Sequence, residues 1–134
     1  MCYYTSCNNA NGGKTLMAEK KTVFLTGASG HMGWAGFKEL YKKKDKLNIV
    51  LLLRDSEKNR KKFANYLNDP SVKIVWGDLK KYDDVLKCVE GSDYVLHVGG
   101  MVSPSADYYP TKTIQTNTTA AKNIVDAVKA QPNK

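Results

Sequence analysis

Residues 22–33 read Thr-Val-Phe-Leu-Thr-Gly-Ala-Ser-Gly-His-Met-Gly, an apolar run that ends in a turn with three glycines. The run Thr22–Thr26 has the length and the β-branched content of a buried strand. Helical spacing follows it directly, because Trp34, Phe37 and Tyr41 lie at positions i, i+3 and i+7. The stretch therefore predicts a strand, a tight turn and a helix in immediate succession.

The same alternation continues along the rest of the chain. Three further runs of strand length occur at Leu47–Leu53, Val72–Trp76 and Asp93–Val98. Alternating strands and helices predict an α/β fold, in which helices cover both faces of a parallel sheet. The residues expected on the inner faces of the later helices are Phe63 and Leu67 within Ser56–Asn68, then Val85, Leu86 and Val89, then Ile114, Ala121, Ile124, Val125 and Val128.

Composition limits the number of domains and the kinds of partner. With 134 residues the chain suits one domain; residues 1–20 are polar and are expected to form a flexible tail before a domain at 21–134. Lys and Arg number 21 against 13 Asp and Glu, a net charge of +8 that favours anionic partners without choosing among them. No apolar run approaches the ~18 residues of a membrane helix, which rules out a spanning protein.

The cysteines and histidines suggest neither a disulfide framework nor a metal site. The three cysteines, Cys2, Cys7 and Cys88, are odd in number and lack metal or redox spacing, which fits a reducing compartment. Two histidines add no ligand pattern. The N-terminus lacks the basic start and apolar core of a secretory signal, so we expect a cytoplasmic protein without a bound metal.

The three glycines of the turn have separate physical roles. One permits the sharp turn, one lets the backbone approach a pyrophosphate, and one lets the helix pack closely on the sheet. The helix start then presents free N–H groups to the phosphates, and the Ser29 hydroxyl adds a further donor. The spacing of Gly27, Gly30 and Gly33 at a strand–turn–helix junction therefore predicts a dinucleotide site. The alternative is a turn that serves packing alone.

This turn resembles the nucleotide-binding signature of the extended short-chain dehydrogenases/reductases. That branch includes NAD-dependent sugar-nucleotide epimerases and dehydratases, dihydroflavonol reductases and 3β-hydroxysteroid dehydrogenases. The resemblance extends from Lys21 to Ala130 and implies a Rossmann-type doubly wound sheet, partial at about four strands, in the order 3-2-1-4. It covers only the N-terminal, cofactor-binding portion of the family. The loop residues that it assigns to the cofactor are Gly27, Ser29, Gly30, His31, Met32 and Gly33.

The end of the second predicted strand bears on the choice of cofactor. Arg54 lies about 20 residues beyond Gly33, where a dinucleotide fold reads the adenosine ribose. An acid at this place binds the ribose hydroxyls of NAD, whereas an arginine pairs with the 2′-phosphate of NADP. Both types are present, as Arg54 and Asp55, and the basic run that follows favours NADP, with NAD as the alternative. That run contains Lys58, Arg60, Lys61 and Lys62, which a solvated helix face also explains.

Two later segments extend the resemblance. Asp78 and Leu79 follow the third strand; in relatives the matching Asp accepts a hydrogen bond from adenine, although Asp78 could also cap a helix. The segment His97–Pro104 is similar to the loop over the pyrophosphate and the nicotinamide ribose, and it adds Gly99, Gly100 and Met101 to the expected site. Glycines there replace the usual alanines and preserve close backbone approach.

The catalytic Tyr and Lys of the family belong after a fifth strand, which this sequence does not reach. Its one Tyr-x-x-x-Lys, Tyr108 to Lys112, is interrupted by Pro110, so the two side chains need not share a helix face. We therefore expect no catalytic residue here and little or no turnover from the chain alone.

The resemblance implies the NADP(H)-binding portion of an oxidoreductase or epimerase, which in the full protein exchanges a hydride with a carbonyl or alcohol substrate. A non-catalytic NAD(P)-binding sensor or scaffold is the alternative. We expect no nucleic-acid partner, because the basic residues lack interleaved aromatics. A homodimer is possible.

Overall fold

The computed structural model describes residues 20–100 and 105–132. The predicted tail, apart from Lys20, and the site residue Met101 lie outside this part of the chain. The four predicted strands are confirmed to within one residue at each end. The elements are β1 (Lys21–Thr26), α2 (His31–Tyr41), β2 (Leu47–Leu53), α3 (Glu57–Lys62), the 3-10 turn η2 (Ala64–Tyr66), β3 (Val72–Trp76), α4 (Tyr82–Val89), β4 (Tyr94–His97), α5 (Ser105–Tyr108) and α6 (Pro110–Lys129).

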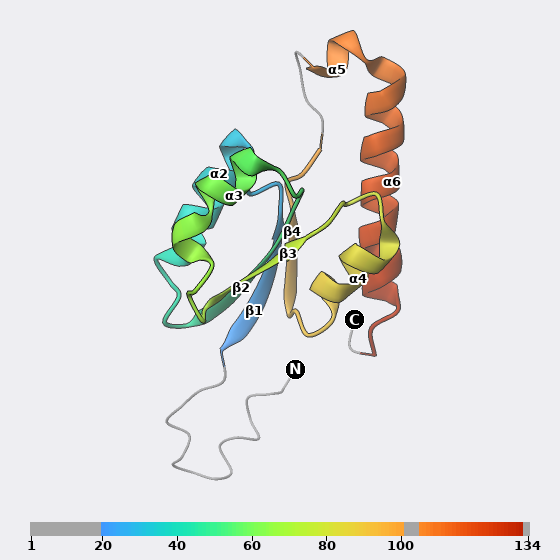
Figure 1. Cartoon of the computed structure of the whole chain (residues 1–134). Helices are drawn as coiled ribbons and strands as arrows, with labels where there is room; N and C mark the ends of the chain where they lie inside the picture. The colour runs from blue at the N-terminus through green and yellow to red at the C-terminus, as the bar shows by residue number, and fades with distance from the viewer. Residues whose placement is uncertain (1–19, 101–104, 133–134) are drawn as a thin grey trace.

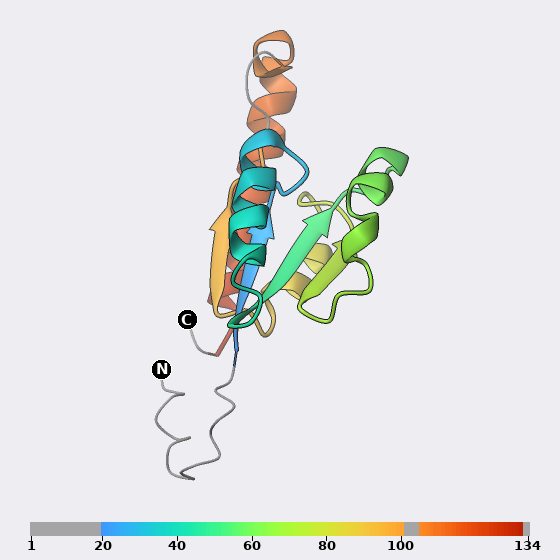
Figure 2. The ribbon, with the colours of Figure 1, turned by 90° about the vertical axis from the view of Figure 1, so that its left-hand side faces the viewer.

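The four strands form one parallel sheet in the order β3-β2-β1-β4, which confirms the predicted topology. The register places Leu25 of β1 between Leu51 of β2 and Leu96 of β4. The helices lie in two layers, α2 and α3 on one face and α4 and α6 on the other (Figures 1 and 2). All strands run the same way, so the loops that follow them gather at one edge of the sheet.

Alternation along the strands produces two separate cores. Successive strand residues point to opposite faces, so Phe24 packs with α4 and α6, whereas Leu25 packs in a core with α2 and with Phe63 and Tyr66, which follow α3. The second core is rich in aromatic rings; Phe37 and Tyr66 meet edge to face with centroids 4.9 Å apart. This core fixes α2 and α3 beside the carboxyl ends of β1 and β2, where the predicted site lies.

The inner face predicted for the last helix is only partly right. Ile124 is buried and Val128 packs against the same core, but Ile114 is 67% exposed and Val125 is 48% exposed. The reason is that α6 packs on α4 along one side only, through Ala120, Ile124 and Ala127. The apolar residues of its other side are left uncovered by the described part of the chain.

The middle helix is shorter than the pattern suggested. Helix α3 ends at Lys62, and η2 replaces the continuation toward Leu67. Phe63 is buried as predicted, but Leu67 is exposed, because the tighter 3-10 turn brings Tyr66 into the aromatic core instead. None of the helices in the described ranges combines the length and the apolar character needed to cross a membrane.

Candidate cofactor site

The glycine turn has the geometry that its three roles require. Gly27 takes a positive φ of 78°, and its carbonyl accepts a 3.0 Å hydrogen bond from the Gly30 N–H. A Cβ on Gly33 would lie 1.8 Å from the Gly27 carbonyl oxygen, so only glycine lets α2 approach the turn this closely. A Cβ on Gly30 would make only an ordinary van der Waals contact, 3.4 Å from the Gly27 carbonyl oxygen. Of the two, only Gly33 is therefore required for the packing of α2 on the turn.

The first turn of α2 leaves its N–H groups available to an anion. Gly30 occupies the N-cap position and offers no side-chain cap, and the first turn contains no acidic residue. An uncapped N-terminus of this kind presents unpaired donors and a positive dipole end. Of the other loop residues expected at the site, His31 and Met32 begin α2 and are exposed.

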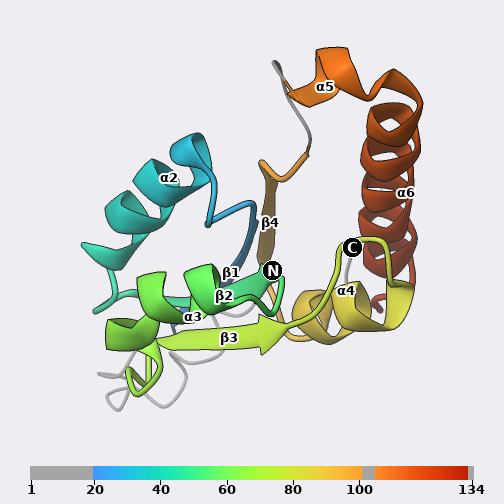
Figure 3. The same cartoon turned by 45° about the horizontal axis from the view of Figure 1, so that its top comes forward.

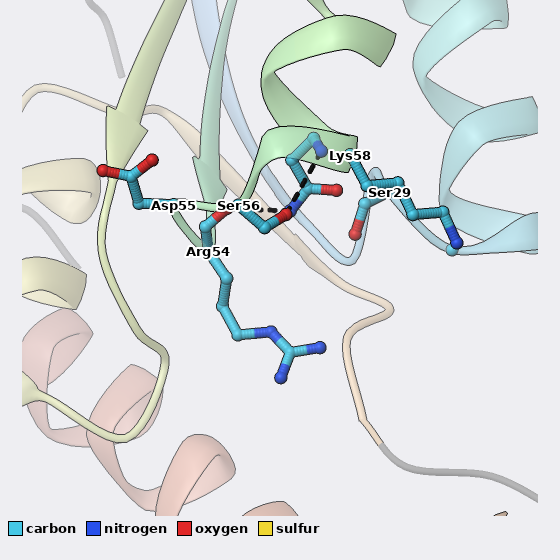
Figure 4. Close-up of a pocket in the computed structure, with 7 residues that line it drawn as sticks. Ser29, Arg54, Asp55, Ser56 and Lys58 are labelled. Atoms are coloured by element: carbon cyan, nitrogen blue, oxygen red, sulfur yellow. Dashed lines mark hydrogen bonds between the residues drawn. The ribbon is translucent and has the colours of Figure 1, made fainter.

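A groove of about 600 Å³ opens beside this turn, between the ends of β1 and β2 and the start of α3 (Figure 4). It brings together Ser29, Gly30 and Arg54, all three of them predicted site residues. The lining residues are Ser29, Gly30, Arg54, Asp55, Ser56, Lys58 and Asn59. The groove is therefore formed by the glycine turn, the segment that follows β2 and one basic helix.

The two charged residues that made the cofactor choice ambiguous have different surroundings. Within the described ranges, Arg54 takes part in no ion pair, whereas both carboxylate oxygens of Asp55 accept hydrogen bonds from Arg60. The Nε–Oδ1 distance is 2.5 Å and the Nη2–Oδ2 distance is 2.9 Å. These bonds hold the pKa of the Asp55 carboxyl below its ordinary value. In Figure 4 the Asp55 carboxylate and the Arg54 guanidinium point in different directions.

Helix α3 is tied to both segments that line the groove. The buried Asn59 donates from Nδ2 to the Arg54 carbonyl at 2.8 Å, and its backbone N–H is capped by Ser56 Oγ at 3.2 Å. Lys62 donates to the Ser29 carbonyl at 3.0 Å, with its ammonium 4.6 Å from the centre of the Trp34 ring. These contacts fix the backbone on which Ser29 and Arg54 stand.

The basic run is thus more than a solvated helix face. Only Lys61 fits that description, because it pairs with the exposed Glu57 one turn away. The hydrogen bonds by which Asn59, Arg60 and Lys62 hold α3 to its neighbours could not be predicted, because their partners lie outside the helix. The one local signal was the Ser56 cap, which fixes where α3 starts and so which of its residues face the groove.

The loop after β3 holds the next two predicted residues. Asp78 Oδ1 accepts a hydrogen bond from the Lys80 N–H at 2.8 Å, so the carboxylate closes a local turn; α4 itself begins later, with Lys81 at its N-cap. The Leu79 carbonyl accepts a 2.8 Å hydrogen bond from Asn123 Nδ2 of α6. A helix from the end of the chain therefore positions this loop.

Thr26, the last residue of β1, joins the first and fourth loops. Its Oγ1 accepts hydrogen bonds from the N–H groups of Val98 and Gly99 at 2.9 and 2.8 Å and lies 2.8 Å from His97 Nδ1. Because both lone pairs are used, the hydroxyl proton is donated to Nδ1, and His97 is neutral with its own proton on Nε2. Burial also lowers the pKa of His97.

The close approach expected of Gly99 is present. A Cβ there would lie 2.9 Å from Leu79 Cδ1 and 3.2 Å from the Gly27 nitrogen, while one on Gly100 would lie 3.1 Å from Asn117 Oδ1. The turns after β1, β3 and β4 are therefore in contact at the carboxyl edge of the sheet. Leu79 and Gly99 are close neighbours on this edge. Neither of them lines the Arg54 groove, and neither do Asp78 and Gly100.

Other candidate chemistry is not supported in the described ranges. Tyr108 ends α5 whereas Lys112 belongs to α6, and the Lys112 ammonium lies 6.0 Å from the ring centre of Tyr109 instead. Residues 20–100 and 105–132 contain no cluster of His, Cys, Asp or Glu that could hold a metal ion. Burial raises the pKa of the Cys88 thiol to about 12, so this thiol is not a nucleophile at neutral pH.

Comparisons with known proteins agree with this geometry. Residues 27–134 match the family described as NAD(P)H-binding. UDP-glucose 4-epimerases of Rickettsia bellii and Rickettsia felis are 32% identical over 111 residues, which is 80% of this chain and 32% of theirs. The chain therefore spans about a third of the length of these curated relatives.

Solved structures show the same fold. Pen from Bacillus thuringiensis superposes with a TM-score of 0.73 at 24% identity, over 84% of this chain and 35% of that one. The Bordetella bronchiseptica enzyme WbmH, solved in complex with NAD⁺, superposes with a TM-score of 0.63 at 22% identity, over 83% of this chain and 36% of that one. The match over residues 27–134 shows that the chain belongs to the NAD(P)H-binding family, and the sheet order agrees with the Rossmann-type fold expected from the sequence.

Proposed function

We propose that this chain binds NADP(H), with the adenosine 2′-phosphate in the groove beside Arg54. The observation that supports this is the division of charge at the end of β2. Arg54 and Lys58 line the groove together with the hydroxyl residues Ser29 and Ser56, while Arg60 occupies the Asp55 carboxylate. Cations and hydroxyl donors suit a phosphate, whereas a ribose diol needs an accepting carboxylate.

The rest of the cofactor would extend along the carboxyl edge of the sheet. We expect the pyrophosphate at Gly30 and the uncapped start of α2, where backbone N–H donors are available. Asp78 and Leu79 would meet the adenine, and Gly99 and Gly100 would line the path toward the nicotinamide ribose. The hydrogen bonds from the Val98 and Gly99 N–H groups to Thr26 Oγ1 support this order, because they hold the loop after β4 beside the glycine turn.

The proposed reaction belongs to the full-length protein, an oxidoreductase or an epimerase. A bound nicotinamide supplies hydride exchange with a carbonyl or alcohol. The residues described here bind and orient the cofactor; none is proposed as catalytic, and we expect little or no turnover from this chain alone. The similarity to UDP-glucose 4-epimerases makes a sugar nucleotide one candidate substrate class for the full-length protein. A sensor or scaffold that uses the same site without catalysis, a cytoplasmic location and a homodimer all stay predictions.

Calorimetric titration with NADP⁺ and NAD⁺ in parallel tests the cofactor assignment. We expect NADP⁺ to bind more tightly, and Arg54→Ala to weaken NADP⁺ binding about tenfold while changing NAD⁺ binding little, because only NADP⁺ carries the phosphate that pairs with the guanidinium. Lys61→Ala is the matched control, since Lys61 is an exposed cation of the same region that pairs with Glu57 outside the groove.

Two results would contradict the proposal. Tighter binding of NAD⁺, or an equal loss of both cofactors in Arg54→Ala, would overturn the 2′-phosphate assignment. Binding of neither cofactor by a chain that circular dichroism shows to be folded would overturn the claim that this portion forms a cofactor site by itself.

A further inference from the structure

The charge of the groove depends on a residue that does not line it. Arg60 lies on α3 and is absent from the lining of the groove, yet it takes both oxygens of Asp55, the neighbour of Arg54. Its guanidinium also stacks on Trp76, 4.5 Å from the ring centre. Trp76 is the last residue of β3 and is held in register with Leu53 of β2. The position of Arg60 is therefore fixed by the sheet as well as by its own helix.

We propose that Arg60 is a positioning residue for cofactor selection, which keeps the Asp55 carboxylate away from the 2′-phosphate. The inference rests on the proposed NADP function. It concerns how this chain resolves the presence of a cation and an acid at adjacent positions. Arg60 neutralises the Asp55 carboxylate from outside the groove, and the Arg54 guanidinium is left to bind the ligand.

The chemistry of the contact suits this role. An arginine fork matches the two oxygens of a carboxylate, and the flat face of the same group stacks on an aromatic ring. With Arg60 in place, Asp55 belongs to a neutral pair, so Arg54 and Lys58 give the groove two positive charges. Without Arg60, the free carboxylate would cancel one of these charges. It would also offer the acceptor that ribose hydroxyls require, so both effects would shift preference from NADP⁺ toward NAD⁺.

If the role of Arg60 were purely structural, its removal would change the stability of the fold and not the ratio of cofactor affinities. The side chains of Arg60 and Asp55 are 50% and 58% exposed, and an ion pair at that exposure contributes little to folding. Removing Arg60 should therefore leave the fold intact while changing the ratio of cofactor affinities. Lys61 again provides the control: it is the next residue, forms a 2.9 Å pair with Glu57, and loses the same unit of charge on substitution.

The test compares dissociation constants for NADP⁺ and NAD⁺ across four proteins: the unchanged chain, Arg60→Ala, Lys61→Ala, and the double variant Arg60→Ala with Asp55→Asn. We expect Arg60→Ala to lower the preference for NADP⁺ about fivefold, the size of one unit charge acting on a phosphate dianion several ångströms away in a water-exposed site. The double variant should restore the preference, because the released carboxylate is gone. Lys61→Ala should leave the preference unchanged.

Adenosine 2′,5′-bisphosphate and AMP serve as second probes, since they occupy only the adenosine end of the site. Their affinity ratio should follow the same pattern. Arg60→Lys keeps the charge without the two-pronged contact, and it is the substitute if Arg60→Ala fails to fold. Its preference for NADP⁺ should be weaker than that of the unchanged chain and of Lys61→Ala, and stronger than that of a chain without the contact.

The outcomes separate the two proposals. If Arg54→Ala abolishes the NADP⁺ preference but Arg60→Ala leaves it intact, the role of Arg60 is wrong and the 2′-phosphate groove stands. If Arg60→Ala lowers the preference but Asp55→Asn fails to restore it, Arg60 does not act through Asp55 and the inference also falls. If the unchanged chain shows no preference for NADP⁺, the proposed function itself fails.

Discussion

The two sides of β1 are built from similar residues but are covered very differently. Leu25 of β1 and Leu96 of β4 are register partners on the same face of the sheet, yet Leu25 is 1% exposed and Leu96 is 44% exposed. Tyr94, two residues before Leu96, is 56% exposed. Helix α2 packs on β1 and β2, and Figure 3 shows α3 beside β2 and β3, away from β4.

This difference separates two ways of holding a site together. On the β2 side, the groove stands on an aromatic core, and hydrophobic burial fixes the elements that carry Ser29 and Arg54. On the β4 side, the loops are held by a few polar contacts, chiefly those of Thr26 and Asn123. The β2 side should therefore respond most to changes in packing, and the β4 side most to the loss of single hydrogen bonds.

The largest effect is expected where α2 meets the glycine turn. Gly33→Ala should lower the free energy of unfolding by more than about 3 kcal/mol, because its Cβ would overlap the Gly27 carbonyl and force the helix away. Gly36→Ala is the control in the same helix; it meets no atom within 4 Å and should raise stability by about 0.5–1 kcal/mol. Urea unfolding of both variants measures the difference. Equal effects would show that the close approach of α2 is not required.

The register partners Leu25 and Leu96 test directly how differently β1 and β4 are covered on this face of the sheet. Leu25→Ala should cost about 2–3 kcal/mol in unfolding free energy, because it opens a cavity in the packed core. Leu96→Ala should cost less than about 1 kcal/mol, because its side chain is already partly in solvent. Chemical denaturation of the two variants provides the comparison. A cost for Leu96→Ala as large as that for Leu25→Ala would mean that this face of β4 is covered in solution.

Loss of the Thr26 hydroxyl tests the polar contacts that hold the loops on the β4 side. Thr26→Val keeps the shape of a buried side chain but leaves the Val98 and Gly99 N–H groups without their acceptor, so we expect a loss of about 2 kcal/mol. Thr26→Ser should retain most of the stability, because it keeps Oγ. Amide exchange at Val98 and Gly99 should accelerate in the valine variant alone. Unchanged exchange would show that Thr26 does not hold this loop.

The smallest effect is a pH dependence from His97. Its pKa in the fold lies below the ordinary 6.5, so the unfolded chain binds more protons than the native chain between the two pKa values. This contribution to stability is complete above pH 6.5 and is lost as the pH falls through the native pKa. NMR titration should place the His97 midpoint below 6.5, with its signal assigned by its absence in His97→Asn. A midpoint at or above 6.5 would contradict the proton assignment at Thr26.

Local patterns predicted most of the fold because strands, turns and glycine positions are set by neighbouring residues. The turn at residues 27–33 and the four parallel strands follow from spacing alone. The exposed Ile114 and Leu67 did not, since which apolar face is buried depends on what packs against it. The Arg60–Asp55 contact could not be predicted either. The sequence shows only that Asp55 follows Arg54, whereas the fold shows that Arg60 of α3, stacked on Trp76, binds the Asp55 carboxylate.

The pairing of β1 with β4 has a consequence for biosynthesis. Thr26 and His97 are 71 positions apart in the chain, whereas Ser29, Arg54 and Lys58 all emerge within its first half. A growing chain folds from its N-terminus, so β1, β2 and β3 can assemble on the ribosome while one edge of β1 still waits for its partner. The residues proposed to bind the 2′-phosphate therefore leave the ribosome before β4 does, and during that interval the edge of β1 that β4 later covers is open.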